Sequence, residues 1–490
     1  MESRSHIKEL FSQTVIYGLG IMLNKSVGFL LLPLYTKYYL PEQIGLFSLI
    51  QSLSLVLGVI YMFGMETSFM KYFIDSKDDN SRSVIYSSTL ALLSVTSVIF
   101  SAAVYLNAGN IAALLNFTGR EESILLIKIL SLLMLVDTVY RFPLLFFRAK
   151  LESKIYAYIN FLTFIVNILC SVLFIVVLKL GVESIFYSYI ISVGVTFILG
   201  LILTKKYLTI HISLIKIKEM LAFGNKFIFI GFFVLFIDVS DRFFLNYFYD
   251  ESMVGIYSAN YRLASVLSFL IASFKFSWTP YFLNLKSNPE NKRIISSIFT
   301  NFVFTGLFLF LVFSVFTEQL VKISFFGIEF LDADYWPGLK IIPVILAAYF
   351  FSGAYSTLNA APFFTDNTQS IFYITLTGLL VNTLFNLILI PVYDIMGAAI
   401  STFLTYFVMF IIIYYYSQKI YRLDYEWGRI IKMVLLTAVF FAVSYFGINK
   451  SGMNILLILA SDIFMIIVYV MLLNILNIID LKKIIQFRKK

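Results

Sequence analysis

The chain has 490 residues, of which 60% are hydrophobic and only 13% are charged, and its formal net charge is +9. Soluble domains contain roughly 45–50% apolar and about 25% charged residues, so this composition excludes a soluble protein. Because Cys170 is the single cysteine, the sequence excludes an intrachain disulfide and a CxxC metal or redox site. The excess of basic residues is typical of the cytoplasmic loops of a membrane protein and does not indicate nucleic-acid binding.

Apolar stretches recur along the whole chain, and a transmembrane helix needs about 20 mostly apolar residues. They lie near 12–36, 43–68, 84–106, 123–147, 155–178, 184–204, 221–248, 253–275, 294–317, 337–361, 370–391, 395–418, 427–447 and 453–476. The sequence therefore predicts an all-α integral membrane protein of fourteen transmembrane helices.

The distribution of basic residues gives the predicted orientation. With the N-terminus on the cytoplasmic side, most Lys and Arg of the predicted loops fall on that side. The opposite side carries only five, namely Lys37, Arg120, Lys179, Lys322 and Lys450. Because positively charged loops stay in the cytoplasm, we expect a multi-pass protein of the bacterial cytoplasmic (inner) membrane with both termini cytoplasmic.

An internal repeat relates the two halves of the chain. Residues 44–48 read IGLFS, and residues 254–258, 210 positions later, read VGIYS. The same spacing relates VIYS at 84–87 to IISS at 294–297. Carriers are often built from such repeats. We predict two pseudo-symmetric six-helix bundles and a C-terminal helix pair. The bundles are an N-lobe at 11–205 and a C-lobe at 221–418, and the pair comprises helices thirteen and fourteen at 427–476.

Two acid-to-base pairs lie inside predicted helices, where an ionisable group costs at least about 2.5–3.5 kcal/mol. Asp137 and Arg141 are four residues apart, as are Asp238 and Arg242, so each pair shares a helix face. The pairs could simply neutralise each other within a bundle. Alternatively, they act in ion coupling or gating, for which Asp241 supplies an additional carboxylate.

Three bases inside predicted helices have no acidic residue three or four positions away: Lys25, Arg262 and Lys275. Lys275 is near enough to a helix end for its ammonium to reach the interface, which is the alternative to a functional role. We predict that these cations form an anion-binding cavity, since guanidinium and ammonium groups bind phosphate oxygens.

Several of these stretches also resemble a known family. Residues 39–48 (YLPEQIGLFS) and 63–73 (FGMETSFMKYF) are similar to segments around helix two of bacterial polysaccharide-biosynthesis flippases. Residues 386–391 (NLILIP) and 395–401 (IMGAAIS) are similar to that family's helix eleven-to-twelve signature. The resemblance places the chain near Wzx-type O-antigen transporters of the multidrug/oligosaccharidyl-lipid/polysaccharide flippase superfamily.

The resemblance implies an undecaprenyl-diphosphate-linked oligosaccharide as cargo and alternating access as the mechanism. The product pathway would be O-antigen lipopolysaccharide, capsule or exopolysaccharide. It implies H⁺ or Na⁺ as coupling ion with no other cofactor or metal, and no enzymatic activity. Expected partners are membrane lipid, a polysaccharide polymerase and a chain-length regulator, with the protein itself a monomer. Related lipid flippases place basic residues on helices one, two and eight, but helix two here has no mid-span base.

Two other functions remain open at this point. A cation-coupled multidrug exporter of the same superfamily would be expected to carry net-acidic cavity residues, whereas the additional charges here include Lys25 and Arg262. A membrane polysaccharide polymerase would need a catalytic site, commonly on a large extracytoplasmic loop. The longest such predicted loops, near 107–122 and 318–336, are short, and no P-loop or acid-rich metal motif is present.

Overall fold

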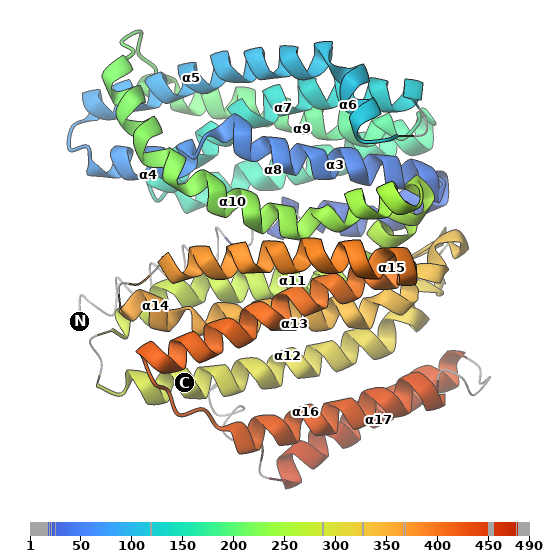
Figure 1. Cartoon of the computed structure of the whole chain (residues 1–490). Coiled ribbons are helices and arrows are strands. Elements are labelled where there is room, and N and C mark those ends of the chain that lie inside the picture. The colour runs from blue at the N-terminus through green and yellow to red at the C-terminus, as the bar shows by residue number, and fades with distance from the viewer. Residues whose placement is uncertain are drawn as a thin grey trace. The chain divides into compact units, whose positions relative to one another are not determined.

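The structure is a computed structural model (Figure 1), and it describes residues 18, 20, 22–24, 26–117, 120–286, 289–325, 328–365, 367, 369–448, 455–476 and 478. The first half of the described chain contains the helices α2 (Leu32–Tyr38), α3 (Pro41–Met62), α4 (Met65–Asp75), α5 (Asp79–Leu106), α6 (Ala108–Leu114), α7 (Arg120–Ala149), α8 (Ser153–Val172), the π-helical turn η1 (Leu173–Val177), α9 (Glu183–Thr204) and the 3₁₀ turn η2 (Lys205–Tyr207).

The second half contains α10 (Leu214–Phe248), α11 (Glu251–Asn284), α12 (Asn291–Val321), the strands β1 (Ser324–Phe325) and β2 (Ile328–Glu329), the 3₁₀ segment η3 (Ala333–Ile341), α13 (Ile342–Leu358), α14 (Ala360–Phe364), α15 (Gln369–Ile420), α16 (Trp427–Ala442), the π-helical turn η4 (Val443–Ile448) and α17 (Ile455–Ile475). The two strands pair antiparallel over two residues each.

The predicted all-helical class is confirmed. Within the described residues, eleven helices are long and apolar enough to cross a membrane. One of them, α15, is broken at Asp394, where φ is 49°, between the predicted spans 370–391 and 395–418. The predicted span 12–36 lies partly outside the described residues, and α10 covers 221–248 without being among the eleven. The total of fourteen therefore stays a prediction.

The predicted span 43–68 is not one continuous helix. Phe63 and Gly64 both have positive φ, 46° and 70°, which ends α3 and starts α4. Gly64 is required twice at this break: its φ is unfavourable for other residues, and a Cβ there would overlap the carbonyl of Gly224 in α10. The stretch between the predicted spans 184–204 and 221–248 is partly helical, because α10 already begins at Leu214.

The contacts divide the chain into two compact units. Unit 1 comprises residues 1–262, 333–338 and 375–401, and unit 2 comprises 263–332, 339–374 and 402–490. In unit 1, α10 runs obliquely across α3, α4 and α5 (Figure 1). In unit 2, α12 packs against α13, α16 and α17. The lobe boundaries drawn from the repeat remain a prediction.

Aromatic side chains fill much of each core. In unit 1 the rings of Tyr86 and Phe142 stack with centroids 5.2 Å apart, and Phe69 meets Phe142 edge-on at 4.6 Å. In unit 2, Trp278 and Phe282 form a buried cluster with rings 5.5 Å apart. Such pairs prefer offset or edge-to-face geometry, which fixes the helices they join.

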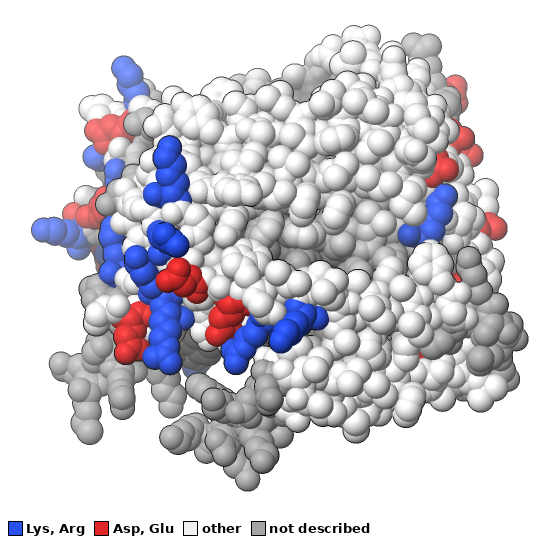
Figure 2. All heavy atoms as spheres, turned by 60° about the horizontal axis from the view of Figure 1, so that its bottom comes forward, with Lys and Arg blue, Asp and Glu red and all other residues white. Residues whose placement is uncertain are grey.

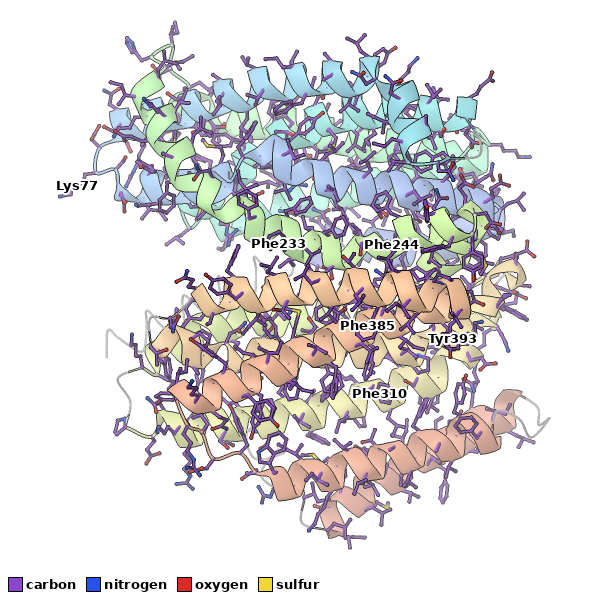
Figure 3. The ribbon with its side chains drawn as sticks, in the orientation of Figure 1. Lys77, Phe233, Phe244, Phe310, Phe385 and Tyr393 are labelled. Atoms are coloured by element: carbon purple, nitrogen blue, oxygen red, sulfur yellow. The ribbon has the colours of Figure 1, made fainter. Side chains whose placement is uncertain are left out.

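On the face shown in Figure 2, most charged side chains lie toward two opposite edges, with Lys and Arg mixed with acidic residues along one of them, and uncharged residues cover most of the surface between. Within unit 1, Lys77 lies at one end and Tyr393 at the other, while Phe233 and Phe244 extend from α10 between them (Figure 3). This pattern is typical of helices that cross a bilayer.

Candidate functional site

The close approach of α3 and α11 positions the first group of candidate residues. A Cβ at Gly45 would overlap the carbonyl of Glu251, and a Cβ at Gly255 would overlap the carbonyl of Pro41. Gly45 and Gly255 are equivalent positions of the 210-residue repeat. Small residues let helices approach closely within a membrane, so the side chains further along the two helices meet.

Arg262 of α11 contacts α3. Its Nη2 donates a hydrogen bond to Oε1 of Gln51 at 2.9 Å, and its guanidinium lies 5.0 Å from the centroid of the Phe47 ring. A ring face attracts a cation, and the amide oxygen fixes one edge of the guanidinium. Arg262 is half-buried, with its Nη1 atom fully buried, and Gln51 is exposed.

Gln51 was not predicted as a site residue, because the predicted site comprised only charged residues. A lone glutamine within the apolar run of 44–62 was the available signal. Gln51 lies in α3, which corresponds to the predicted helix two, where the sequence lacks the basic residue that related flippases have. In α3, the residue that contacts Arg262 of α11 is therefore a neutral glutamine.

Asp241 and Arg242 of α10 form a second group with Tyr257 and Tyr261 of α11. Arg242 Nη1 lies 2.9 Å from Asp241 Oδ1, and Tyr257 donates its hydroxyl to Asp241 Oδ2 at 2.5 Å. The guanidinium lies 4.7 Å from the centroid of the Tyr261 ring, and it also donates to the backbone carbonyl of Asp238 at 3.0 Å.

The sequence predicted a pair between Asp238 and Arg242, with Asp241 as an additional carboxylate. In the structure, Arg242 forms an ion pair with Asp241. Asp241, expected to supply an additional carboxylate, is almost fully buried and bonded to its neighbour Arg242 and to Tyr257. Asp241, Arg242 and Arg262 together carry a formal net charge of +1.

Asp137 and Arg141 of α7 form the predicted i,i+4 pair. Arg141 Nε and Nη2 each lie 2.8 Å from Asp137 Oδ2, and Tyr189 of α9 donates its hydroxyl to Oδ1 at 2.8 Å. The structure adds Glu66, whose Oε1 lies 3.6 Å from Arg141 Nη1. Glu66 sits in the first turn of α4, directly after the break that ends α3.

The remaining two cations fall elsewhere. Lys25 lies outside the described residues. Lys275 is half-buried in unit 2, where its ammonium donates a hydrogen bond to Ser352 Oγ of α13 at 3.3 Å. The structure thus gives Lys275 a neutral hydroxyl partner, and the predicted roles of both lysines stay predictions.

A network of neutral polar side chains, which the sequence did not predict, lies between α10 and the two halves of α15. Ser240 donates to Asn382 Oδ1 at 2.7 Å, Asn386 Nδ2 donates to the same oxygen at 3.1 Å, and Ser401 donates to the Asn382 carbonyl at 3.1 Å. All four side chains are fully buried. Asn386 Oδ1 has no hydrogen-bond partner within the described part of the chain.

The charged groups described above can bind ions and polar ligands. Among the described residues, no three His, Cys, Asp or Glu side chains cluster to hold a metal ion. The guanidinium of Arg262, fixed by Gln51 and Phe47, carries the positive charge and N–H donors that bind an oxyanion such as a phosphate. Away from bulk water this interaction is strengthened by the lower dielectric constant.

Comparisons with known proteins give the chain its context. A family model described as Polysaccharide biosynthesis protein matches residues 10–286. No curated protein sequence matches the chain significantly. The chain is similar to the structure of the lipid II flippase MurJ in an inward closed conformation, with a TM-score of 0.75 and 14% identity over 94% of this chain and 99% of that chain.

Similar structures also include multidrug transporters. An inward-facing multidrug resistance MATE family transporter of the MOP superfamily has a TM-score of 0.66 and 13% identity over 83% of this chain and 95% of that chain. A mutant of the Vibrio cholerae MATE transporter VcmN has a TM-score of 0.56 and 14% identity over 86% of this chain and 98% of that chain. These likenesses show that the chain has a MurJ/MATE-like fold.

Proposed function

Because the chain belongs to the Polysaccharide biosynthesis protein family, we propose that it flips undecaprenyl-diphosphate-linked oligosaccharide repeat units from the cytoplasmic to the periplasmic leaflet. The resemblance in residues 39–48 and 63–73 is confirmed by the family model, which spans both segments. The MurJ-like fold supports a lipid-linked cargo, because the protein named in that comparison is a lipid II flippase. The product would be O-antigen, capsule or exopolysaccharide.

The observation that carries the proposal is the half-buried Arg262 inside a membrane-spanning helix, held by Gln51 and Phe47. A lipid-linked oligosaccharide joins its sugar to its lipid through a diphosphate, which needs a fixed cation if it is to leave the headgroup region. Arg262 is the binding residue in this proposal, and Gln51 and Phe47 position its guanidinium. The lipid tail stays in the bilayer while the hydrophilic head crosses.

Coupling to H⁺ or Na⁺ is assigned to the acidic groups. Asp137, paired with Arg141, and the Asp238–Asp241–Arg242 segment of α10 are the charged groups that two conformations could stabilise differently. An ion shifts a conformational equilibrium only through such differential binding. Protein-bound cofactors and catalytic chemistry have no part in this mechanism, which operates in the bacterial cytoplasmic membrane with both termini in the cytoplasm.

The test is transport by purified protein in proteoliposomes that contain a lipid-linked oligosaccharide. Arg262→Ala should reduce the initial rate of flipping at least tenfold, since removing a charge-assisted pair costs roughly 1.5–3 kcal/mol. Arg262→Lys should retain part of the rate because it keeps the charge but loses the planar fork. The matched control is Arg422→Ala, whose side chain is 85% exposed in a loop. Full transport by Arg262→Ala would remove Arg262 from the site.

A cation-coupled multidrug exporter is the second candidate, favoured by the likeness to MATE transporters. Deleting the gene distinguishes the two functions. Loss of surface glycan, with repeat units held on the cytoplasmic leaflet, supports the flippase. Intact glycan with greater sensitivity to cationic drugs supports the exporter.

A further inference from the structure

The crossing of α3 and α11 is reciprocal. The carbonyl of Pro41 faces Gly255, and the carbonyl of Glu251 faces Gly45. Both Pro41 and Glu251, and both glycines, are 210 positions apart, so the two copies of the repeat motif contact each other through equivalent residues. By the predicted orientation, this contact lies at the extracytoplasmic end of both helices.

One helical turn further along, each helix carries a buried serine. Ser48 and Ser258 are also equivalent in the repeat, and they are only 2% and 1% exposed. Neither hydroxyl has a hydrogen-bond partner within the described residues. A buried hydroxyl without a partner is unfavourable, so the closed contact carries a cost that hydration of the two serines would relieve.

The 3₁₀ segment η3 connects the start of α3 to α11 through hydrogen bonds of Tyr335. Tyr335 of η3 is fully buried, and its hydroxyl donates to the backbone carbonyl of Tyr39, which follows α2, at 2.7 Å. Its own carbonyl accepts a hydrogen bond from Asn260 of α11 at 2.8 Å. Gly338 lies against the same asparagine, where a Cβ would overlap the Asn260 amide nitrogen.

The binding pair lies directly beyond the crossing. Gln51 follows Ser48 by three residues and Arg262 follows Ser258 by four, so on each helix the site is one turn deeper than the serine. By the predicted orientation, the crossing therefore lies between the Arg262 site and the extracytoplasmic end of the two helices.

We propose that the α3–α11 crossing is the extracytoplasmic gate over the Arg262 site, and that Tyr335 is the strap that keeps it closed. The glycines allow the helices to touch, and the two serines make the closed contact incompletely bonded. The strap supplies the hydrogen bonds that hold the crossing shut. This inference rests on the proposed function for its cargo, and its test measures the gate without cargo.

The test measures the labelling rate of a cysteine placed at the crossing. Ser48→Cys in a Cys170→Ser background is reacted with a membrane-impermeant maleimide in right-side-out and inside-out vesicles. Tyr335→Phe, which removes only the hydroxyl, should raise the rate from the extracytoplasmic side about two- to tenfold, the range expected for the loss of one hydrogen bond. Leu40→Cys, 62% exposed before α3, gives the rate of an open position and identifies the side.

The matched control is Tyr86→Phe. Tyr86 is also fully buried, and its hydroxyl shares a single 2.8 Å hydrogen bond with Thr204, away from the crossing. It should leave the labelling rate at the parental value. Ser258→Cys serves as a second reporter, should Ser48→Cys fail to fold.

Two results would overturn the gate. The first is equal labelling in the Tyr335→Phe and Tyr86→Phe proteins. The second is parental labelling of Ser48→Cys as fast as that of Leu40→Cys. Failure of the flippase function is seen separately, as absence of oligosaccharide flipping by a protein that shows the labelling pattern of a strapped gate.

Discussion

The Asp137–Arg141 pair allows a structural role to be separated from a role in transport. The side chain of Asp137 is only 7% exposed, and it accepts hydrogen bonds from Arg141 and Tyr189. Replacing Asp137 with Leu leaves the guanidinium beside an apolar group and removes the acceptor of Tyr189. Breaking a fully buried pair in this way costs roughly 3–5 kcal/mol. Because Arg141 is 41% exposed and keeps Glu66 nearby, we expect a smaller loss, about 2–3 kcal/mol.

The double replacement Asp137→Leu with Arg141→Met removes both charges. It should lose much less stability than the sum of the two single replacements, because no uncompensated charge remains. Thermal unfolding of the purified protein in detergent, compared across the four members of the cycle, measures this coupling. A full-size loss in the double variant, equal to the sum of the singles, would refute the reasoning that the two side chains form one neutral unit.

The same four proteins decide between the two interpretations of the pair. A stable double variant that still flips lipid-linked oligosaccharide would make the pair structural. A stable double variant that binds cargo but transports none would place the pair in coupling or gating. Glu66→Gln is the companion variant, since Glu66 contacts Arg141 at 3.6 Å without belonging to the buried pair.

Two further predictions concern packing. Gly255→Ala should lower the unfolding temperature and the yield of folded protein, since its Cβ would overlap the Pro41 carbonyl and overpacking costs about 1–3 kcal/mol. The control Gly231→Ala, with no atom within 4 Å of its Cβ, should leave the unfolding temperature and the yield unchanged. Equal behaviour of the two variants would refute the close contact at Gly255. Asn382→Leu should destabilise the protein by about 1–3 kcal/mol because Ser240 and Asn386 lose their shared acceptor, and an unchanged denaturation midpoint would contradict the network.

Local sequence was enough to predict much of the architecture. Runs of apolar residues predicted helices at 84–106, 155–178 and 184–204, and the structure has α5, α8 and α9 there. Helical periodicity predicted the Asp137–Arg141 pair, because residues four apart share a helix face whatever the helix packs against. The 210-residue repeat pointed to equivalent segments, and Gly45 and Gly255 do meet.

Only the tertiary structure decided which helices supply partners across space. Gln51 beside Arg262, Glu66 beside Arg141, and Tyr335 between Tyr39 and Asn260 each join segments far apart in the chain. The break at Phe63–Gly64 was also missed, since two successive residues with positive φ cannot be recognised from hydropathy. The physical reason is the same in each case. Hydropathy and helical period act over a few residues, whereas partner choice depends on the crossing and rotation of packed helices, which no single segment encodes.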